Sequence, residues 1–406
     1  MQSRCAIRIS PARKLSGSRW MKAFEPTFCE CRIESPARPK FGAMISMRMQ
    51  DATARVMPDI ANEARADLGQ VLEGVGMQEI ALPVMLAGVD GSRLQTPARV
   101  NVFVSLERAD IRGIHMSRLY LDLDKHLCAQ LLSPRSIHAL LEDFLASHKD
   151  LSERAMVRIS FDQLLLRPAL VSSTSGWRAY PVVITGVQEQ GLFRLELATE
   201  VLYSSTCPSS AALARQLIQE QFAKDFPCGE NLDHGRVCAW LGNERGILAT
   251  PHSQRSRLQL RAWLQQSFDE LPIRELIDTV EHALQTPVQT AVKREDEHAF
   301  ARLNGANLMF CEDAGRRVRA ALADHPRILD FWARAIHEES LHAHNAVAVV
   351  TKGVADGFNG GSEWVGKWAG PAASRILLRA SNPTSRCGGS HLPVRSSRKN
   401  RRCGAA

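Results

Sequence analysis

The sequence predicts an α+β fold in which antiparallel sheets are covered on one face by helices. Strand-like segments come in consecutive pairs joined by polar turns, and pairs of amphipathic helical segments separate the strand pairs. This order occurs about twice along the chain. Because strands joined by short turns run antiparallel and amphipathic helices need an apolar surface to cover, the pattern favours an α+β architecture.

The first half begins with a strand and continues into a helix. Residues 98–106 alternate polar and apolar side chains, as a half-buried strand does. Residues 113–118 are polar and led by glycine, so we expect a loop there. Ser133-Pro134 then starts a helix, and residues 155–161 form a further strand. The apolar stripe of the helix consists of Ile137, Leu140, Leu141, Phe144 and Leu145.

The middle of the chain predicts a long hairpin, with strands at 178–187 and 192–203. The second strand delivers Cys207 just beyond its end. Residues 209–226 follow as a second amphipathic helix. The Gly-rich, polar residues 227–250 look like an insertion with one short helical piece.

The last part of the body contains two more helices and the final strands. Residues 255–264 alternate again, and residues 272–284 form a helix. Residues 290–293 are extended. Residues 311–323 form a helix that opens with acids, which are favourable at a helix N-terminus. Residues 328–350 form the last strand pair or one long strand.

The two ends differ in composition from the body. Residues 1–56 and 353–406 lack helix and strand periodicity and are rich in Arg and Ser. We expect both to be disordered, with out-of-frame sequence as an alternative for 353–406. A transit peptide, or a true start at Met44, Met47 or Met57, are further interpretations of the first segment.

Charge and cysteine usage narrow the class of protein. The net charge of +8 comes from the two ends, since the body is mildly acidic. This argues against a nucleic-acid partner. No segment has the roughly 18 uninterrupted apolar residues of a membrane helix, so we expect no membrane partner. The five cysteines of the body are dispersed without a CxxC pair, which favours a reducing, cytoplasmic compartment.

Three residues of the body are of the types that ligate a hydrolytic metal. Cys207 precedes a helix, where a thiol has a depressed pKa. His252 lies in a polar loop, and Glu297 ends the extended segment beside Lys293 and Arg294. A small residue at a tight turn, a surface histidine and a solvated charge run are the ordinary alternatives. Zinc accepts S, N and O ligands and leaves a position for water, but the wide separations cannot show that the three converge.

Two further candidates carry acid/base groups. Glu312 opens the helix 311–323, where it could simply serve the helix dipole. His342 and His344 follow Glu338-Glu339, and on a strand two residues this far apart share a face. Histidine suits proton transfer near neutral pH, and an exposed pair is the alternative.

Several sequence blocks between 57 and 351 occur together and in one order. They are Met57-Pro58-Asp59, Gly113-Ile114-His115-Met116-Ser117-Arg118, Ser205-Thr206-Cys207-Pro208, Pro251-His252-Ser253-Gln254-Arg255, Phe268-Asp269-Glu270-Leu271-Pro272-Ile273, Thr286-Pro287-Val288-Gln289-Thr290, Phe310-Cys311-Glu312-Asp313 and Glu339-Ser340-Leu341-His342-Ala343-His344-Asn345-Ala346. With these blocks the chain resembles the type IB GTP cyclohydrolase I family, the bacterial and archaeal enzymes of the tunnelling-fold superfamily.

The resemblance implies a fold and an activity. It implies two tandem tunnelling-fold modules, residues 57–200 and 201–352, with most catalytic residues in the second. It also implies a homotetramer that hydrolyses GTP at C8 of the purine. The products are formate and 7,8-dihydroneopterin triphosphate, at the first step of pterin and folate biosynthesis.

The family's site residues fall on matching positions of this chain. Cys207, His252 and Glu297 are the implied ligands of a divalent metal, Zn²⁺ or Mn²⁺. Glu312 is implied to anchor the purine and His342 to transfer protons, so Cys207, Glu312 and His342 are the expected catalytic residues. Besides Glu312, our candidates for binding GTP are His115, Ser117, Arg118, Arg255, Lys293 and Arg294.

Two departures from the family pattern and three alternatives accompany this interpretation. The insertion at 227–250 lengthens the connection between Cys207 and His252 relative to the shorter members. Ser209 stands where many members have a second cysteine, which removes a regulatory disulfide but none of the implied ligands. The alternatives are another pterin or purine-derived enzyme of the superfamily, a relative impaired by the altered C-terminus, and a non-catalytic RNA-binding protein that uses its basic ends.

Overall fold

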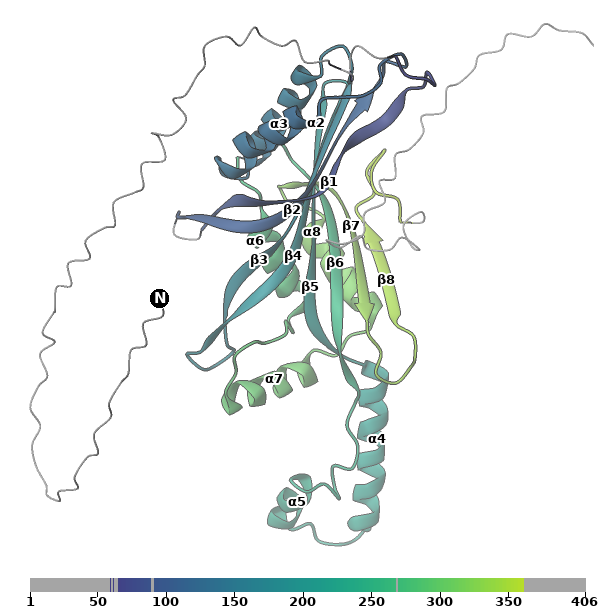
Figure 1. Cartoon of the computed structure of the whole chain (residues 1–406). Coiled ribbons are helices and arrows are strands. Elements are labelled where there is room, and N and C mark those ends of the chain that lie inside the picture. Colours follow the sequence, from purple (N-terminus) through teal and green to yellow (C-terminus); the bar gives the residue numbers. More distant parts are fainter. Residues whose placement is uncertain (1–58, 60, 62–64, 89–90, 268, 361–406) are drawn as a thin grey trace, which may run out of the picture. The chain divides into compact units, whose positions relative to one another are not determined.

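Eight antiparallel strands form one continuous sheet whose spatial order follows the chain (Figure 1). The computed structural model describes residues 59, 61, 65–88, 91–267 and 269–360. The strands are β1 (Leu72–Ala87), β2 (Arg93–Leu106), β3 (Arg154–Pro168), β4 (Ser175–Glu189), β5 (Leu192–Thr206), β6 (Ser253–Leu264), β7 (Ile328–His337) and β8 (Ala346–Thr351). The α+β class with antiparallel strands is therefore confirmed.

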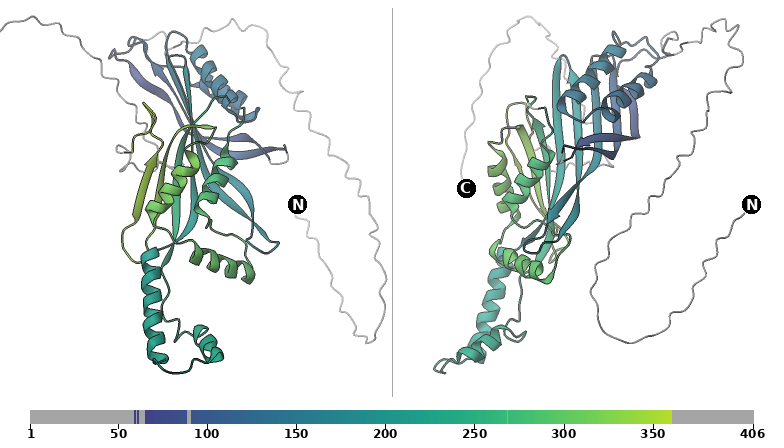
Figure 2. Two further views of the ribbon diagram at one scale, coloured as in Figure 1. Left: turned by 180° about the vertical axis from the view of Figure 1, so that it is seen from behind. Right: turned by 90° about the vertical axis from the view of Figure 1, so that its left-hand side faces the viewer.

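The helices lie in the connections between the strands. They are α2 (Met116–Leu123), which continues into the π-helical segment η1 (Asp124–Cys128), α3 (Pro134–Ser147), α4 (Pro208–Asp225), α5 (His234–Leu241), α6 (Ile273–Leu284), α7 (Arg294–Ala306) and α8 (Cys311–Leu322). Helix α3 contacts β3 and β4, α6 contacts β5, and α8 contacts β7 and β8 (Figure 2). No helix in the described part of the chain is long and apolar enough to cross a membrane.

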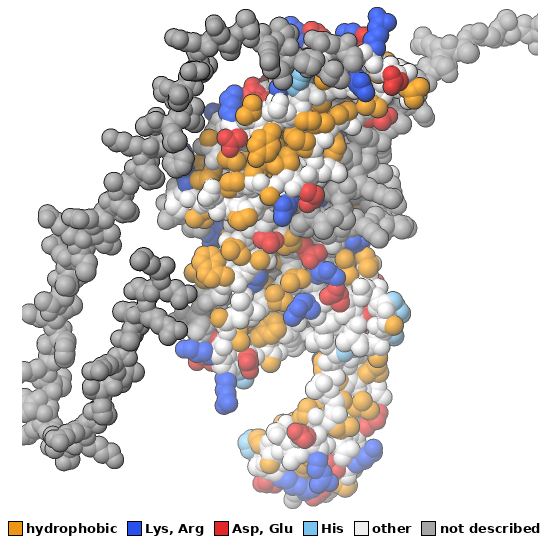
Figure 3. Space-filling model, viewed as in Figure 1, with side chains coloured by type: hydrophobic (Ala, Val, Ile, Leu, Met, Phe, Trp, Pro, Cys, Tyr) orange, Lys and Arg blue, Asp and Glu red, His pale blue; other side chains and the backbone are white. Residues whose placement is uncertain are grey.

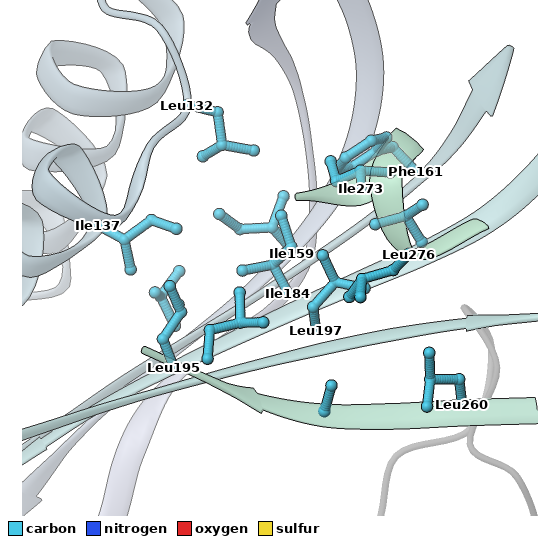
Figure 4. Close-up of a cluster of buried hydrophobic side chains, with 14 of the residues drawn as sticks. Leu132, Ile137, Ile159, Phe161, Ile184, Leu195, Leu197, Leu260, Ile273 and Leu276 are labelled. Atoms are coloured by element: carbon cyan, nitrogen blue, oxygen red, sulfur yellow. The ribbon is translucent and has the colours of Figure 1, made fainter. Parts of the chain in front are cut away.

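One hydrophobic core lies between the sheet and these helices. Antiparallel pairing puts Ile159, Ile184 and Leu197 side by side on neighbouring strands. Ile137 of α3 and Leu276 of α6 pack against this row, and all five side chains are fully buried (Figure 4). Because burial of a large aliphatic side chain contributes about 1.5–3 kcal/mol, this shared core holds the sheet and helices together.

The order of elements repeats once. Strands β1–β4 with α2 and α3 match β5–β8 with α6 and α8, each in the order strand, strand, helix, helix, strand, strand. Helices α4 and α5 interrupt the β5–β6 connection, and α7 lies between α6 and α8. The strands nevertheless form a single sheet and a single core.

Helices α4 and α5 form a small separate cluster in the β5–β6 connection. The Trp240 ring packs edge-on against Phe222 and Phe226, and its Nε1 donates to Asp225 Oδ2 at 2.8 Å. The expected amphipathic helix at 209–226 is found as α4, but its leucines are not buried within the chain, since Leu213 and Leu217 are 61% and 45% exposed. Figure 3 shows hydrophobic side chains mixed with charged ones at the surface of this segment.

Three other expectations are corrected by the structure. Residues 116–118 are not a loop, because His115 is the N-cap of α2 and the helix begins at Met116. Glu297 does not end an extended segment but lies in the first turn of α7. His342 and His344 do not lie on a strand, since β7 ends at His337 and β8 starts at Ala346.

Most residues of the two chain ends lie outside the described part of the chain. The expectations for residues 1–56 and 361–406 therefore concern residues that the structure does not describe. Residues 353–360 are described and pack on the sheet. Asp330 is fully buried and accepts hydrogen bonds from the backbone of Gly353 at 2.9 Å and Phe358 at 2.6 Å. The Phe358 ring lies 5.0 Å from the ring of Trp263.

Candidate functional site

The ends of β5 and β6 bring Cys207 and His252 together. Thr206 pairs with Ser253 in the sheet, and their hydroxyl oxygens are 2.7 Å apart. One residue beyond this pair, the Cys207 backbone N–H donates to the His252 carbonyl at 3.3 Å. The strand register thus makes neighbours of two residues that are far apart in the sequence.

Both residues are fixed by the start of α4. Cys207 is the N-cap of this helix and is half-buried. Ser210 in the first turn accepts the backbone N–H of His252 at 3.0 Å. The helix start and the strand register thus fix the backbone of both residues at one end of the sheet.

The His252 imidazole has a free nitrogen. Its Nε2 is buried and has no hydrogen-bond partner among the described residues. It lies 3.4 Å from Oε2 of Glu339, and the two side chains are 19% and 13% exposed. A buried imidazole nitrogen without a hydrogen bond, close to a carboxylate, fits a metal ligand.

The structure does not bring Glu297 to these residues as a third ligand. Glu297 is exposed in the first turn of α7. Within the described ranges, no three His, Cys, Asp or Glu side chains form a group able to hold a metal ion. The predicted pair Cys207 and His252 is thus adjacent, while Glu339 is the carboxylate beside it.

Glu312 is brought to the same end of the sheet. The Met309 backbone N–H donates to the Thr206 carbonyl at 3.1 Å, which joins the start of α8 to the end of β5. Glu312 is exposed in the first turn of α8, and the Cys311 thiol donates to its Oε2 at 3.3 Å. Burial, together with the neighbouring Glu312, raises the pKa of Cys311 to about 12, so this thiol stays protonated and remains a donor.

A buried His–Tyr pair, which sequence patterns did not indicate, lies behind these carboxylates. His337 Nε2 is 3.0 Å from Tyr203 Oη, and the two side chains are 2% and 0% exposed. Burial lowers the pKa of His337, while the nearby carboxylates of Glu339, Glu312 and Asp313 oppose this shift. The only sequence signal for His337 is its position just before Glu338-Glu339.

His342 lies in the loop between β7 and β8. It is exposed, and its ring stacks on that of His344 with centroids 5.0 Å apart and planes 11° from parallel. The loop begins where β7 pairs with the start of β6 through His337 and Ser256. His342 is therefore on the connection that leaves the same end of the sheet.

The expected GTP-binding residues are distributed over three elements. In the first half, His115 Nε2 contacts Asp59 Oδ2 at 3.2 Å, and Arg118 donates to the Ser147 carbonyl at 2.6 Å. Ser117 is exposed in α2. In the second half, Arg255 is exposed on β6, while Lys293 and Arg294 are exposed at the start of α7.

Fold and site together define a class of protein. Thiol, imidazole and carboxylate groups meet at one end of an antiparallel sheet, and such groups on rigid elements are what a hydrolytic enzyme uses. The family model described as type I GTP cyclohydrolase folE2 matches residues 57–348. The chain therefore belongs to the type I GTP cyclohydrolase FolE2 family, which is the family shown in place of the expected type IB designation.

Curated relatives agree with this assignment. The chain is 47% identical over 302 residues to a GTP cyclohydrolase FolE2 of Pseudoalteromonas translucida, covering 74% of this chain and 99% of the relative. It is also 47% identical over 303 residues to a GTP cyclohydrolase FolE2 of Hydrogenovibrio crunogenus, covering 75% and 96%. Among solved structures, uricase from Arthrobacter globiformis aligns with a TM-score of 0.37 and 9% identity, covering 77% of this chain and 96% of the uricase.

Proposed function

We propose that this chain is a GTP cyclohydrolase I, which hydrolyses GTP to 7,8-dihydroneopterin triphosphate and formate for pterin and folate biosynthesis. The observation that carries the proposal is the 47% identity to relatives named GTP cyclohydrolase FolE2 along almost their entire length. The adjacent Cys207 and His252 support it, because they supply the sulfur and nitrogen donors that such hydrolysis needs.

We infer that Cys207 and His252 hold a divalent ion, Zn²⁺ or Mn²⁺, with Glu297 as the third ligand where the site is completed between copies, because within one chain Glu297 lies apart from this pair. The unbonded, buried Nε2 of His252 supports this role. When bound, such an ion supplies Lewis acidity, which lets water act as a nucleophile near neutral pH. Glu339 Oε2 lies 3.4 Å from His252 Nε2, so a carboxylate stands beside the position of the ion.

The remaining site residues would bind the substrate and move protons. The exposed carboxylate of Glu312 can accept two hydrogen bonds from the N–H edge of guanine, a geometry that fixes the ring. The Cys311 thiol on Oε2 favours one orientation of that carboxylate. His342 would protonate the imidazole ring nitrogens of the purine as the bond between C8 and N9 breaks.

The triphosphate requires cations. Our candidates are the side chains of Arg118, Arg255, Lys293 and Arg294, with His115 and Ser117 lining the same site. His115, Ser117 and Arg118 belong to the first half of the chain, while the other three belong to the second.

We propose further that the active site is completed in a homotetramer of two-module, tunnelling-fold subunits in the cytoplasm. The repeated element order supports the two modules. Glu297, Glu312 and His342 are all exposed rather than enclosed. Two hollows of about 520 and 610 Å³ in the described part are lined by none of the expected site residues. A site shared between copies accounts for this exposure.

The proposal is tested by incubating the metal-stripped protein with GTP, with and without Mn²⁺ or Zn²⁺. Formate release and neopterin fluorescence after dephosphorylation and oxidation report turnover. Cys207→Ala should lose at least about 100-fold in kcat/KM, since it removes a metal donor, and outer contacts to a ligand alone are worth 10–100-fold. Leu213→Ala, at an exposed position on the same helix, is the matched control. Full turnover by Cys207→Ala would contradict the assignment.

A further inference from the structure

We propose that Asp296 is a positioning residue that holds the first turn of α7, and with it Glu297, Lys293 and Arg294, in place for the metal and the triphosphate. This inference rests on the proposed function. The hydrogen bonds of the Asp296 carboxylate would fix the positions of these three side chains.

Asp296 is bound by four hydrogen bonds inside the protein. It is completely buried. Its Oδ1 accepts the backbone N–H groups of Val171 and Ser172, both at 2.8 Å. Its Oδ2 accepts the Ser172 hydroxyl at 2.6 Å and the Lys293 backbone N–H at 2.8 Å. The carboxylate thereby joins the loop between β3 and β4 to the start of α7.

That loop is itself rigid. Ala169 donates to the Thr174 carbonyl at 2.9 Å, and the hydroxyl oxygens of Ser172 and Thr174 are 2.7 Å apart. Thr174 also donates to the Ala291 carbonyl at 3.2 Å, which ties the loop to the segment preceding α7. Asp296 is thus attached to a loop that has its own hydrogen bonds and that connects β3 to β4.

Helix α7 has little else to hold it. Asp296 is the one fully buried residue of this helix in the structure. Ala299, Phe300 and Leu303 are half-buried, so the hydrogen bonds of this one carboxylate are the main attachment of the first turn of the helix. A buried carboxylate that accepts several N–H and O–H donors forms strong, directional bonds.

The next residue faces another way. Successive residues of an α-helix are rotated by roughly 100°, and Glu297 is exposed where Asp296 is buried. Lys293 and Arg294, at the N-cap and the first helical position, are exposed as well. Loss of the Asp296 bonds would leave all three on a helix free to shift.

The test compares the full-length wild-type chain with Asp296→Asn, Ser172→Ala and Glu297→Ala. Asn keeps the shape of Asp296 but presents an NH₂ group to donors, while Ser172→Ala removes one of the four bonds. Asp233→Asn is the matched control, because Asp233 also accepts a helix N–H (Arg236, 2.7 Å) but lies in the α4–α5 insertion.

The first readout is the Mn²⁺ or Zn²⁺ affinity of metal-stripped protein, measured by competition with a chromogenic chelator. We expect Asp296→Asn to weaken affinity about 10–100-fold, as loss of a contact that orients a ligand does. Ser172→Ala should show a smaller loss, and Asp233→Asn none. Excess metal should restore kcat in Asp296→Asn but not in Glu297→Ala. Hydrogen exchange over 294–306 should accelerate in Asp296→Asn alone.

The outcomes separate the two proposals. If the wild-type chain binds metal but does not convert GTP, the proposed function fails, and the affinity series still decides the role of Asp296. Wild-type metal affinity in Asp296→Asn would overturn the positioning role, whether or not GTP is converted. If Asp296→Asn does not fold, Ser172→Ala decides, and wild-type affinity in that variant overturns the inference.

Discussion

The cysteines of this chain differ in reactivity because they differ in environment. Cys311 is 6% exposed, and its pKa is raised to about 12, whereas Cys228 and Cys238 are exposed. Since the thiolate is the reactive form, iodoacetamide at pH 8 should modify Cys228 and Cys238 in the native protein and leave Cys311 intact. Peptide mass spectrometry after a short pulse measures this. Labelling of Cys311 at the rate of Cys238 would show that its thiol is not held as a donor to Glu312.

The buried His148 makes stability depend on pH. It is 1% exposed, and burial lowers its pKa below the ordinary 6.5. As pH falls below 6.5, the unfolded chain therefore binds a proton before the folded chain does, so the free energy of unfolding decreases. Well above 6.5 both states are neutral at this residue and the effect is absent.

This pH effect is measured by urea unfolding of wild type and His148→Asn at pH 8, 6.5 and 5.5. The wild type should lose more stability than the variant between pH 6.5 and 5.5, and the two should change in parallel between pH 8 and 6.5. Equal losses in the acid range would mean that His148 does not contribute.

Single residues of the site were only partly predictable from sequence. A cysteine and a histidine are residue types that bind metals, so the sequence indicated Cys207 and His252 as ligands. The two residues are neighbours because Thr206 pairs with Ser253, and no local sequence pattern encodes this pairing. His337 and Asp296 were not indicated. Their roles come from burial and hydrogen bonds with residues far along the chain, such as Tyr203 and Ser172.

Among the elements, α3 depends on a glycine in the strand beneath it. A Cβ added at Gly186 of β4 would lie 2.6 Å from Cγ2 of Ile137. Ile137 is fully buried and cannot move without disturbing the core. Gly186→Ala should therefore destabilise the protein by about 1–3 kcal/mol, as overpacking does. The midpoint of chemical unfolding measures this, and Gly305→Ala, where nothing lies within 4 Å, is the control.

Elements with a clear apolar period were predictable, and those without one were not. The strand at 98–106 and the helix from Ser133-Pro134 were confirmed as β2 and α3. Helix α7 was missed because its first turn is a run of charges and its one fully buried residue is an aspartate. For α4, the amphipathic pattern predicted the helix but not its burial, because the helix buries only Ala211 and Ala214 within the chain. Periodicity shows which residues are apolar, not whether the fold supplies a surface to cover them.

For the molecule as a whole, the folded unit continues beyond the last strand. Strand β8 ends at Thr351, yet Asp330 of β7 depends on residues further along. It is fully buried and receives backbone N–H groups from Gly353 and Phe358. A chain cut after Lys352 leaves this carboxylate buried with fewer donors. An unsatisfied buried polar group destabilises by about 1–3 kcal/mol, and by more when it is charged.

Two truncated chains test this boundary. Residues 57–360 should keep the wild-type unfolding midpoint and GTP turnover, because the family match ends at 348 and the Asp330 contacts end at Phe358. Residues 57–352 should unfold at a clearly lower denaturant concentration. Asp330→Asn removes the buried charge in both chains. It should partly restore stability to the shorter chain and not to the longer one, because only the shorter chain lacks the N–H donors of Gly353 and Phe358. Equal stability of the two truncated chains would show that residues 353–360 do not belong to the folded unit.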